Sequence, residues 1–291
     1  MNDQRVIGLN EYPRRHAQAV ASPFRYPGGK GFLTGFLAQE CVVKLAGVGR
    51  RYAEPFCGGA GAALNLLKDG TVTCIALNDF DIRIYSAWTA IVRETDRFVA
   101  RIRETPPTVA AWRRMREQVE DAGQGYNFDL GFATYFLNRT STAGIVIGSG
   151  PIGGFEQAGK WKIDARYYAD SMIRRIEWIG TQSERIQISC ETAHDFLERE
   201  VSEGKARGTF YFVDPPYIEA GSKLYLNAMD LLQHRSLAQI LRSGVLPHWV
   251  LTYDDDPYVR TVYAGCDIQQ LEVNYSLRKT RKARELIIRA A

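Results

Sequence analysis

The stretch GTFYFVDPPYIEAGS, residues 208–222, decides the fold. Its apolar run, residues 209–213, has the composition of a strand buried on both faces, which is typical of a parallel sheet covered by helices. An acid, two prolines and an aromatic residue follow at Asp214, Pro215, Pro216 and Tyr217. Proline fixes φ and has no backbone N–H, so we expect the chain to leave this strand as a rigid corner that carries Asp214 at its tip.

Strands and helices alternate on both sides of this corner. RYAEPFCGGAGAALNLL (51–67) predicts a strand, a glycine turn and a helix, and VTCIALND (72–79) predicts a second strand that ends in polar residues. RIQISC (185–190) and HWVLTYDDD (248–256) predict further strands. Residues 229–244 predict a helix with Asp230 as its N-cap, and residues 266–290 predict two strands joined by a basic turn. This alternation favours an α/β fold with a mostly parallel sheet and helices on both faces.

The middle of the chain, residues 104–185, breaks this alternation. It opens with Pro106-Pro107, continues with two helical stretches, and holds six glycines from Gly144 to Gly159. We therefore predict an inserted, mainly helical domain at 104–185 between the two segments of the α/β domain, 23–103 and 186–291. Residues 1–22 are predicted to form an N-terminal arm.

Composition excludes several classes of protein. Of the 291 residues, 45% are hydrophobic, which is enough for a well-buried core, and the net charge of +4 is too small to indicate a nucleic-acid partner by itself. The five cysteines form no CxxC pair and the four histidines form no HExxH motif, so we expect a reduced protein without a metal site. With neither a secretory signal nor an 18-residue apolar run, the expected location is the cytoplasm.

The glycine turn EPFCGGAG, residues 54–61, predicts a ligand site, because open parallel sheets bind ligands at the carboxyl ends of their strands. Asp79 ends the next strand, where a carboxylate can accept hydrogen bonds from ribose hydroxyls. Leu64 stands where a dinucleotide fingerprint has its third glycine, which argues against NAD. Glu54 disfavours phosphate and suits an amino-bearing ligand such as S-adenosylmethionine. Turn glycines are also common in proteins without such a site, and Asp79 could simply cap the following helix.

Three motifs together resemble one enzyme family. FRYPGGK (24–30), then EPFCGGAG, then DPPY after an inserted region, is similar to the Dam-like, D12 class, alpha-group DNA adenine-N6 methyltransferases. LNRTSTAGI, GPIGGFEQAGKWKID, LTYDDD and NYSLRKTRKARELII add to the resemblance, which covers residues 22–289. It implies a Rossmann-like, S-adenosylmethionine-dependent methyltransferase domain with an inserted target-recognition domain. It also implies a site-specific, adenine-specific DNA-methyltransferase that acts on double-stranded DNA near the nucleoid, either as a stand-alone enzyme or within a restriction-modification or phage–host system.

The resemblance assigns roles to matched positions. For cofactor binding these are Phe24, Gly28, Gly29, Lys30, Glu54, Phe56, Gly58, Gly59, Asp79, Asp195 and Phe196. For catalysis they are Asp214, Pro215, Pro216 and Tyr217. For DNA binding they are Lys30, Asn138 and Arg139, to which the position of Lys160 and Lys162 beside the glycine-rich loop adds two candidates. Cys57 fills a variable slot of the glycine turn, and much of the insert matches no motif.

The chemistry of adenine methylation explains the DPPY corner. The exocyclic amine of adenine is a poor nucleophile, and a carboxyl with a reference pKa of about 3.9 cannot deprotonate it. Asp214 can instead accept one amine hydrogen while the Pro215 carbonyl accepts the other, so that positive charge on the nitrogen is stabilised as it develops. Tyr217 would stack on a base that has been turned out of the duplex.

Other functions stay open at this point. An RNA adenine methyltransferase and a DNA cytosine-N4 methyltransferase are the nearest alternatives, although an acid at the first DPPY position favours adenine. A glutamine methyltransferase would carry asparagine there, and a cytosine-C5 enzyme would need a Pro-Cys dipeptide, which this chain lacks. A catalytically inactive DNA-binding homologue is the alternative outside enzymes. Asp195 could also be an N-cap, and Lys30 a solvated lysine.

Overall fold

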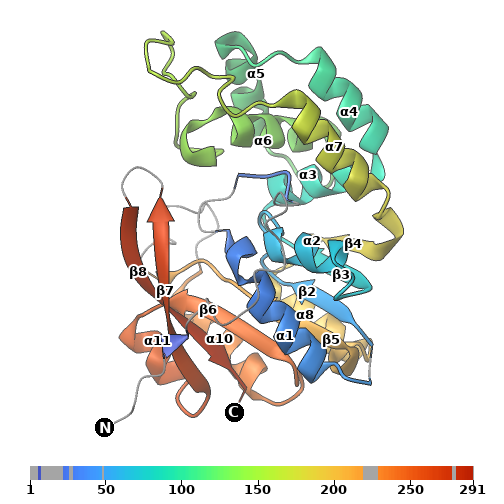
Figure 1. Cartoon of the computed structure of the whole chain (residues 1–291), viewed down its shortest axis with the longest axis vertical. Helices are drawn as coiled ribbons and strands as arrows, with labels where there is room; N and C mark the ends of the chain where they lie inside the picture. Colours follow the sequence, from blue (N-terminus) through green and yellow to red (C-terminus); the bar gives the residue numbers. More distant parts are fainter. Residues whose placement is uncertain are drawn as a thin grey trace.

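A computed structural model describes residues 6–7, 22–25, 29–47, 49–218, 229–276 and 280–290. Its strands are β1 (Val6–Ile7), β2 (Arg51–Glu54), β3 (Cys74–Asn78), β4 (Ile186–Ser189), β5 (Thr209–Val213), β6 (Trp249–Asp254), β7 (Asp267–Ser276) and β8 (Thr280–Arg289). In the described residues they form one eight-stranded sheet in the order β1-β7-β8-β6-β5-β2-β3-β4 (Figure 1). All pairs are parallel except those of β8, which is antiparallel to β6 and β7. The predicted α/β fold, with a mostly parallel sheet and a C-terminal antiparallel strand, is confirmed.

The order of the strands reverses between β2 and β5. From β2 the chain proceeds to β3 and β4 on one side, and then returns to place β5 and β6 on the other. Such a reversal opens a crevice at the carboxyl ends of the strands, because the connections that follow the two central strands leave toward opposite sides. The ends of β2, β3 and β5 therefore mark the expected ligand site.

Helices cover both faces of the sheet. They are η2 (Lys30–Leu33), α1 (Thr34–Lys44) and α2 (Gly61–Lys68), and then α8 (Ala193–Ser202), η5 (Ala206–Gly208), α10 (Leu231–Arg242) and α11 (Pro257–Val262). All five residues of β5 are buried: Phe210 and Phe212 belong to the core beneath α1 and α2, whereas Tyr211 and Val213 belong to the core beneath α8 and α10. This alternation confirms that the strand is buried on both faces. Asp230 caps α10, as predicted, and forms a capping box with Gln233.

The remaining helices form a lobe beside the carboxyl edge of the sheet, at the top of Figure 1. They are α3 (Ile82–Arg93), α4 (Thr95–Glu104), α5 (Val109–Glu120), α6 (Phe128–Thr140), η3 (Thr142–Gly144), α7 (Ala169–Gly180) and η4 (Ser183–Arg185). The segment from Ile82 to Glu104 forms two helices, because the backbone leaves helical geometry at Glu94. Both α3 and α4 pack against α6 or α7, so the lobe begins before residue 104. The described helices lack the combination of length and apolar character needed to cross a bilayer.

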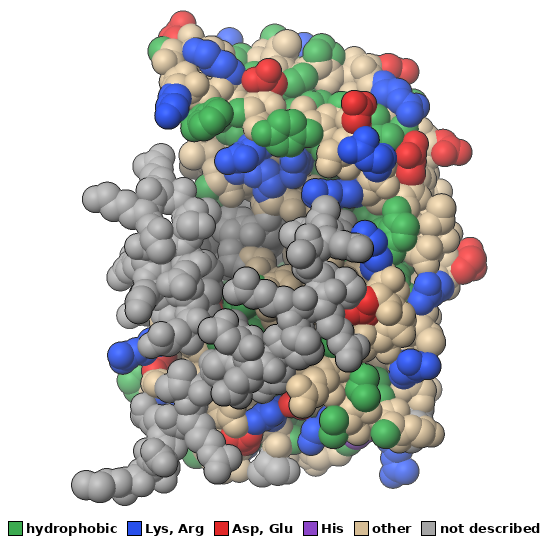
Figure 2. Space-filling view, viewed as in Figure 1, with side chains coloured by type: hydrophobic (Ala, Val, Ile, Leu, Met, Phe, Trp, Pro, Cys, Tyr) green, Lys and Arg blue, Asp and Glu red, His purple; other side chains and the backbone are tan. Residues whose placement is uncertain are grey.

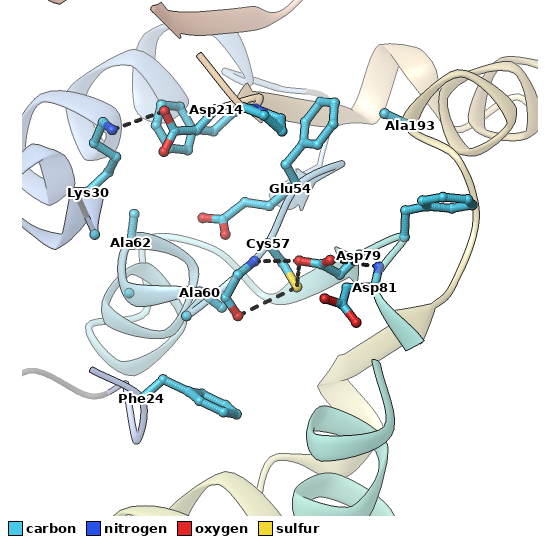
Figure 3. Close-up of a pocket in the computed structure, with 18 of the residues that line it drawn as sticks. Phe24, Lys30, Glu54, Cys57, Ala60, Ala62, Asp79, Asp81, Ala193 and Asp214 are labelled. Atoms are coloured by element: carbon cyan, nitrogen blue, oxygen red, sulfur yellow. Dashed lines mark hydrogen bonds and ion pairs between the residues drawn. The ribbon is translucent and has the colours of Figure 1, made fainter. Parts of the chain in front are cut away.

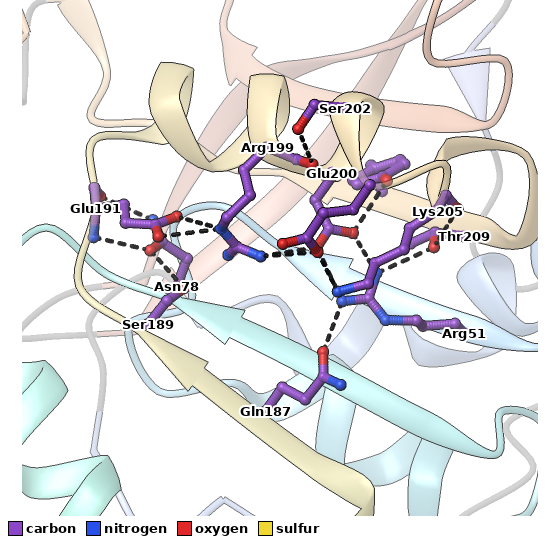
Figure 4. A network of polar contacts seen from close by, with 12 residues as sticks. Arg51, Asn78, Gln187, Ser189, Glu191, Arg199, Glu200, Ser202, Lys205 and Thr209 are labelled. Carbon is purple, nitrogen blue, oxygen red and sulfur yellow. Dashed lines mark hydrogen bonds and ion pairs between the residues drawn. The ribbon is translucent and has the colours of Figure 1, made fainter.

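A buried polar network joins the sheet to α8 (Figure 4). Glu200 of α8 is fully buried and is paired with the guanidinium of Arg51, which opens β2. Arg51 also donates to the hydroxyl of Thr209, which opens β5, at 3.1 Å, and the Tyr211 hydroxyl donates to Glu200 at 3.2 Å. Removing one partner of a buried ion pair leaves an uncompensated charge, so this network holds β2, β5 and α8 in register.

Candidate active site

A cavity of about 850 Å³ lies at the carboxyl ends of β2, β3 and β5, where the strand order reverses (Figure 3). The residues predicted from sequence that line it are Phe24, Gly29, Lys30, Glu54, Phe56, Gly58, Gly59, Asp79, Asp214 and Pro216. Residues that line it without having been predicted include Ser22, Phe32, Phe80, Asp81, Thr192, His194, Met229, Gln233 and Ser236. The cavity therefore brings the glycine turn and the DPPY corner to one space. Gly28 lies outside the described residues.

The glycine turn is fixed by its backbone conformation and by the neighbouring strand. Gly58 has φ +43°, a conformation that glycine adopts without strain, and its N–H donates to the carboxylate of Asp79 at 2.9 Å. Its carbonyl accepts from the indole N–H of Trp88 in α3 at 2.8 Å. The turn is therefore set by β3 on one side and by the helical lobe on the other.

Asn78 holds together the loops that follow three strand ends. Its side-chain amide donates to the carbonyls of Pro55 and Glu191, at 2.9 and 3.0 Å, and its side-chain oxygen accepts from the Ser189 hydroxyl at 2.8 Å. Asn78 is fully buried at the end of β3, and Figure 4 shows it beside β4. A buried amide with all these bonds made rigidifies its surroundings, so Asn78 fixes the chain entering the glycine turn.

Two carboxyl groups line the glycine-turn end of the cavity. Burial raises the pKa of Glu54 to about 8, although the Tyr52 hydroxyl and the Ala63 N–H donate to its Oε1 at 3.1 and 3.2 Å. Burial, and next the charge of Asp81, raise the pKa of Asp79 to about 7. Desolvation disfavours the ionised form of an acid, and a cationic or hydrogen-bond-donating ligand offsets that effect. These two carboxyls therefore suit a ligand that carries amino and hydroxyl groups.

Asp214, at the other end of the cavity, has a different set of neighbours. The ammonium of Lys30 lies 3.0 Å from its Oδ1, and the Thr252 hydroxyl donates to the same oxygen at 2.6 Å. Lys30 is buried, so the alternative of a solvated lysine is wrong, and its ammonium lies 3.8 Å from Glu285 and 5.0 Å from the centre of the Tyr217 ring. Figure 3 shows the Asp214 carboxylate and Glu54 facing the same space. The Tyr217 ring packs against the core beneath α8 and α10, outside the cavity wall, and its hydroxyl donates to Asp214 at 3.4 Å.

The segment 22–25 connects the cavity to the helical lobe. The Ser22 hydroxyl donates to the carbonyl of Gly59 at 2.5 Å. Phe24 lines the cavity and packs against the rings of Trp88 and Tyr135, with ring centroids 5.0 and 5.5 Å apart. This segment therefore forms part of the wall next to the glycine turn.

Asn138 and Arg139, predicted to bind DNA, have a structural role instead. Both are buried, and Asn138 forms two hydrogen bonds with the backbone of Arg25, at 2.7 and 2.8 Å, and a third with the carbonyl of Gly144 at 2.9 Å. Arg139 donates to the carbonyls of Arg166 and Pro23, at 2.5 and 3.5 Å. Because these side chains bond to buried backbone, they hold segment 22–25 and present no free group to DNA.

Asp195 and Phe196, predicted to hold the cofactor's adenine, lie outside the cavity wall. Asp195 is exposed in the first turn of α8, where its N–H donates to the hydroxyl of Thr192, the N-cap, at 3.1 Å. Phe196 is buried in the core beneath α8 and α10. Thr192 and His194 line the cavity in their place. The sequence at residues 192–195 is typical of the start of a helix. In the first turn, the cap geometry directs the Asp195 side chain away from the cavity wall.

Lys160 and Lys162 are exposed on the glycine-rich loop of the helical lobe. The Lys160 ammonium lies 5.7 Å from the ring of Trp161, which is 65% exposed. Gln157 fixes the loop by donating to the carbonyls of Ile152 and Gly154, at 2.9 and 2.6 Å. A basic, aromatic surface of this kind suits a nucleic acid. Across the described ranges, no three His, Cys, Asp or Glu side chains form a group that could hold a metal ion.

Comparison with known proteins identifies the family. The family model for D12 class N6 adenine-specific DNA methyltransferases matches residues 26–277, most of the chain. No curated protein matches the sequence. Two solved structures of the rRNA methyltransferase aviRa from Streptomyces viridochromogenes are similar at 15% identity and a TM-score of 0.40, covering 91% and 94% of this chain and 86% and 90% of theirs. That similarity is too weak to carry an argument. From the family match, the chain belongs to the D12 class N6 adenine-specific DNA methyltransferases.

Proposed function

We propose that this enzyme transfers the methyl group of S-adenosylmethionine to the exocyclic amine of an adenine turned out of double-stranded DNA, at a specific site. One observation carries the proposal. A single cavity is lined by Glu54 and Asp79 beside the glycine turn and also by Asp214 at the DPPY corner. A methyl donor and a methyl acceptor have to share such a space, because transfer needs the two reacting atoms in contact.

The residues at the glycine-turn end fit S-adenosylmethionine. Its sulfonium supplies an electrophilic methyl group. Glu54 and Asp79 would accept hydrogen bonds from its amino group and ribose hydroxyls, and the glycine turn lets backbone approach it closely. Phe56 and Phe80 give the cavity apolar walls for a purine. Among the described residues, neither carboxyl has a lysine or arginine as close as Asp214 has Lys30, which fits a ligand with its own positive charge.

At the DPPY corner, Asp214 and the Pro215 carbonyl would accept the two amine hydrogens of adenine. Positive charge grows on the amine nitrogen during transfer, and fixed acceptors stabilise it without reorganising. Because this pocket lies at a strand tip inside the protein, the base has to leave the duplex to reach it. For Tyr217 to stack on the base and offset the cost of unstacking it from DNA, its ring would have to turn from the core beneath α8 and α10 toward the cavity.

The surface above the cavity suits DNA. Figure 2 shows Lys and Arg side chains gathered on the helical lobe next to a hollow in this face of the molecule. Lys160 and Lys162 lie on the same lobe and are exposed. Contacts between such cations and phosphates bind DNA of any sequence, whereas the choice of site needs contacts with base edges.

The experiment is transfer of a tritiated methyl group to unmethylated DNA, followed by digestion to nucleosides. We expect label in N6-methyladenine with the wild type and with Asp121→Ala, a control at the exposed C-cap of α5 that does not line the cavity, and none with Asp214→Ala. Label in RNA, in protein or in cytosine, or full activity of Asp214→Ala, would overturn the proposal. S-adenosylmethionine should also raise the melting temperature of the free enzyme.

Mapping methylated adenines in DNA from cells that express the chain would then give the recognised sequence. A restriction endonuclease that cuts the same sequence, and that is blocked by the methyl group, is the partner this activity would serve. Random methylation without a shared sequence would contradict site specificity.

A further inference from the structure

We infer that Thr252 is a positioning residue for methyl transfer. Its hydroxyl and the ammonium of Lys30 engage Oδ1 of Asp214 and thereby present Oδ2 to the amine of the target adenine. This inference rests on the proposed role of Asp214 as the acceptor of an amine hydrogen. No motif used to identify the family assigns a role to Thr252.

The sheet brings Thr252 to Asp214 by register and alternation. Val213 of β5 lies opposite Leu251 of β6, so the next residues along these two parallel strands are Asp214 and Thr252. Side chains alternate along a strand, and Thr252 therefore shares the face of Val250, which belongs to the same core as Phe212. Phe212 and Asp214 both line the cavity, so Thr252 stands on the cavity side of the sheet.

The contacts divide the two oxygens of the Asp214 carboxylate. Thr252 donates to Oδ1 at 2.6 Å, the distance typical of a charge-assisted bond between a hydroxyl and a carboxylate, and Lys30 lies 3.0 Å from the same atom. Tyr217 donates to the same oxygen at 3.4 Å, so the described side-chain donors of Asp214 gather on Oδ1. An amine hydrogen is then best accepted by Oδ2, and the orientation of the carboxylate is fixed before the base arrives.

The hydrogen bond to Asp214 explains why a hydroxyl occurs at this point of β6. Thr252 is fully buried, and the three residues before it are Trp249, Val250 and Leu251. Burying a hydroxyl costs free energy unless it is hydrogen-bonded, and valine has the same shape without that requirement. The bond to Asp214 is the contact that gives threonine an advantage here.

Glu285 supports the same arrangement from the next strand. It is buried on β8, two residues before Ile287, which pairs with Thr252 across the sheet. Its carboxyl lies 3.8 Å from the Lys30 ammonium. Lys30 thus stands between two acids, and the charge of Glu285 helps to hold its ammonium beside Asp214.

The test compares Thr252→Val, which keeps shape and loses the hydroxyl, with Thr252→Ser, which keeps the hydroxyl. Thr134→Val is the matched control, because Thr134 is also fully buried and bonds only within α6. We expect Thr252→Val to lower kcat by about 10- to 100-fold, the size of one hydrogen bond to a charged group. KM for S-adenosylmethionine and for DNA should stay within about threefold, since a positioning residue acts on the transition state.

Thr252→Ser should recover most of the rate, and Thr134→Val should keep all of it. If Thr252→Val does not fold, Glu285→Gln tests the arrangement through Lys30, with an expected severalfold loss of kcat. Unchanged kcat in Thr252→Val, with Asp214→Ala inactive, would overturn this inference and leave the proposed function standing. An active Asp214→Ala would overturn both.

Discussion

Asp79 and Asp214 occupy equivalent places on either side of β2, and their neighbours give them different tasks. Each acid directly follows a strand that pairs with β2. Asp79 accepts from the backbone N–H groups of Gly58 and Asp81, whereas Asp214 is bound by the side chains of Lys30 and Thr252. The fold thus supplies carboxylates at one edge of the sheet, and the local donors decide which chemistry each can perform.

We expect the difference in charge between these two acids to separate binding from catalysis. Asp79 has a raised pKa and neutral donors, so a ligand with hydroxyl or cationic groups gains by restoring its ionised form. Asp214 already has a cation at 3.0 Å and is oriented by it. We therefore expect the glycine-turn end of the cavity to control affinity for the methyl donor, and the DPPY end to control the rate of transfer.

Asp79→Asn should have the largest effect on binding. We expect it to raise the Kd for S-adenosylmethionine by about 10- to 100-fold, since it removes the charge from a hydrogen-bonded acceptor. The amide oxygen can still accept from Gly58, so the glycine turn should keep its shape. At saturating donor, kcat should stay within about threefold of the wild type. Calorimetric titration and single-turnover transfer measure the two quantities.

Asp214→Asn is the matched counterpart, with the opposite expected pattern of retained affinity and reduced kcat. A lower kcat with unchanged affinity in Asp79→Asn would contradict the proposal that Asp79 controls binding and Asp214 controls the rate of transfer.

The free energy of unfolding of the free enzyme should depend on pH. We expect this effect to be smaller than the effect of Asp79→Asn on binding. Glu54 and Asp79 have pKa values of about 8 and about 7 when folded, against ordinary values near 4. Between about pH 4 and pH 8 the folded state therefore binds more protons than the unfolded state, and its free energy of unfolding falls as the pH rises. Denaturant unfolding across this range measures the slope, and Glu54→Gln should flatten its upper part.

Binding of S-adenosylmethionine should have the opposite pH dependence. Its positive charge favours the ionised carboxyls, so affinity should rise about tenfold from pH 6 to pH 9, with release of protons on binding. Titration in two buffers of different ionisation enthalpy counts those protons. Affinity that is flat across this range would show that the two carboxyls are already ionised in the free enzyme.

The sequence predicted the sheet and the cavity edge well, because both depend on local pattern. The apolar run of β5, and the acid that directly follows β3 or β5, can each be recognised from a few neighbouring residues. Thr252 and Glu285 were missed because their roles depend on register: each is ordinary in sequence and meets Asp214 or Lys30 only when β5, β6 and β8 align. LTYDDD was noticed as a motif, but nothing in it distinguishes the threonine.

The helical lobe was predicted less well for a related reason. The family resemblance implied DNA contact at Asn138 and Arg139. Their side chains instead face the buried backbone of segment 22–25, a contact between residues more than a hundred positions apart. A motif shows that a residue matters, but burial decides whether it touches a ligand or the protein's own chain.

Asn138→Ala should have the smallest effect on the site. It tests whether the glycine-turn end of the cavity can be changed without changing the DPPY end. It removes three hydrogen bonds to Arg25 and Gly144, so we expect a loss of about 1–3 kcal/mol of stability. Segment 22–25 contacts the glycine turn through Ser22, so the Kd for the methyl donor should rise severalfold while kcat stays unchanged. Gly144→Ala should act similarly, because its Cβ would lie 2.4 Å from the Arg25 carbonyl.

Asn127→Ala separates this effect from general destabilisation. Asn127 caps the start of the same helix, α6, by accepting from the Leu130 N–H at 3.0 Å, and it has no hydrogen bond to segment 22–25 among the described residues. Its loss should cost about 1 kcal/mol and leave donor affinity unchanged. If both variants weakened donor binding equally, the effect would come from the stability of the lobe, and segment 22–25 would have no specific role at the glycine turn.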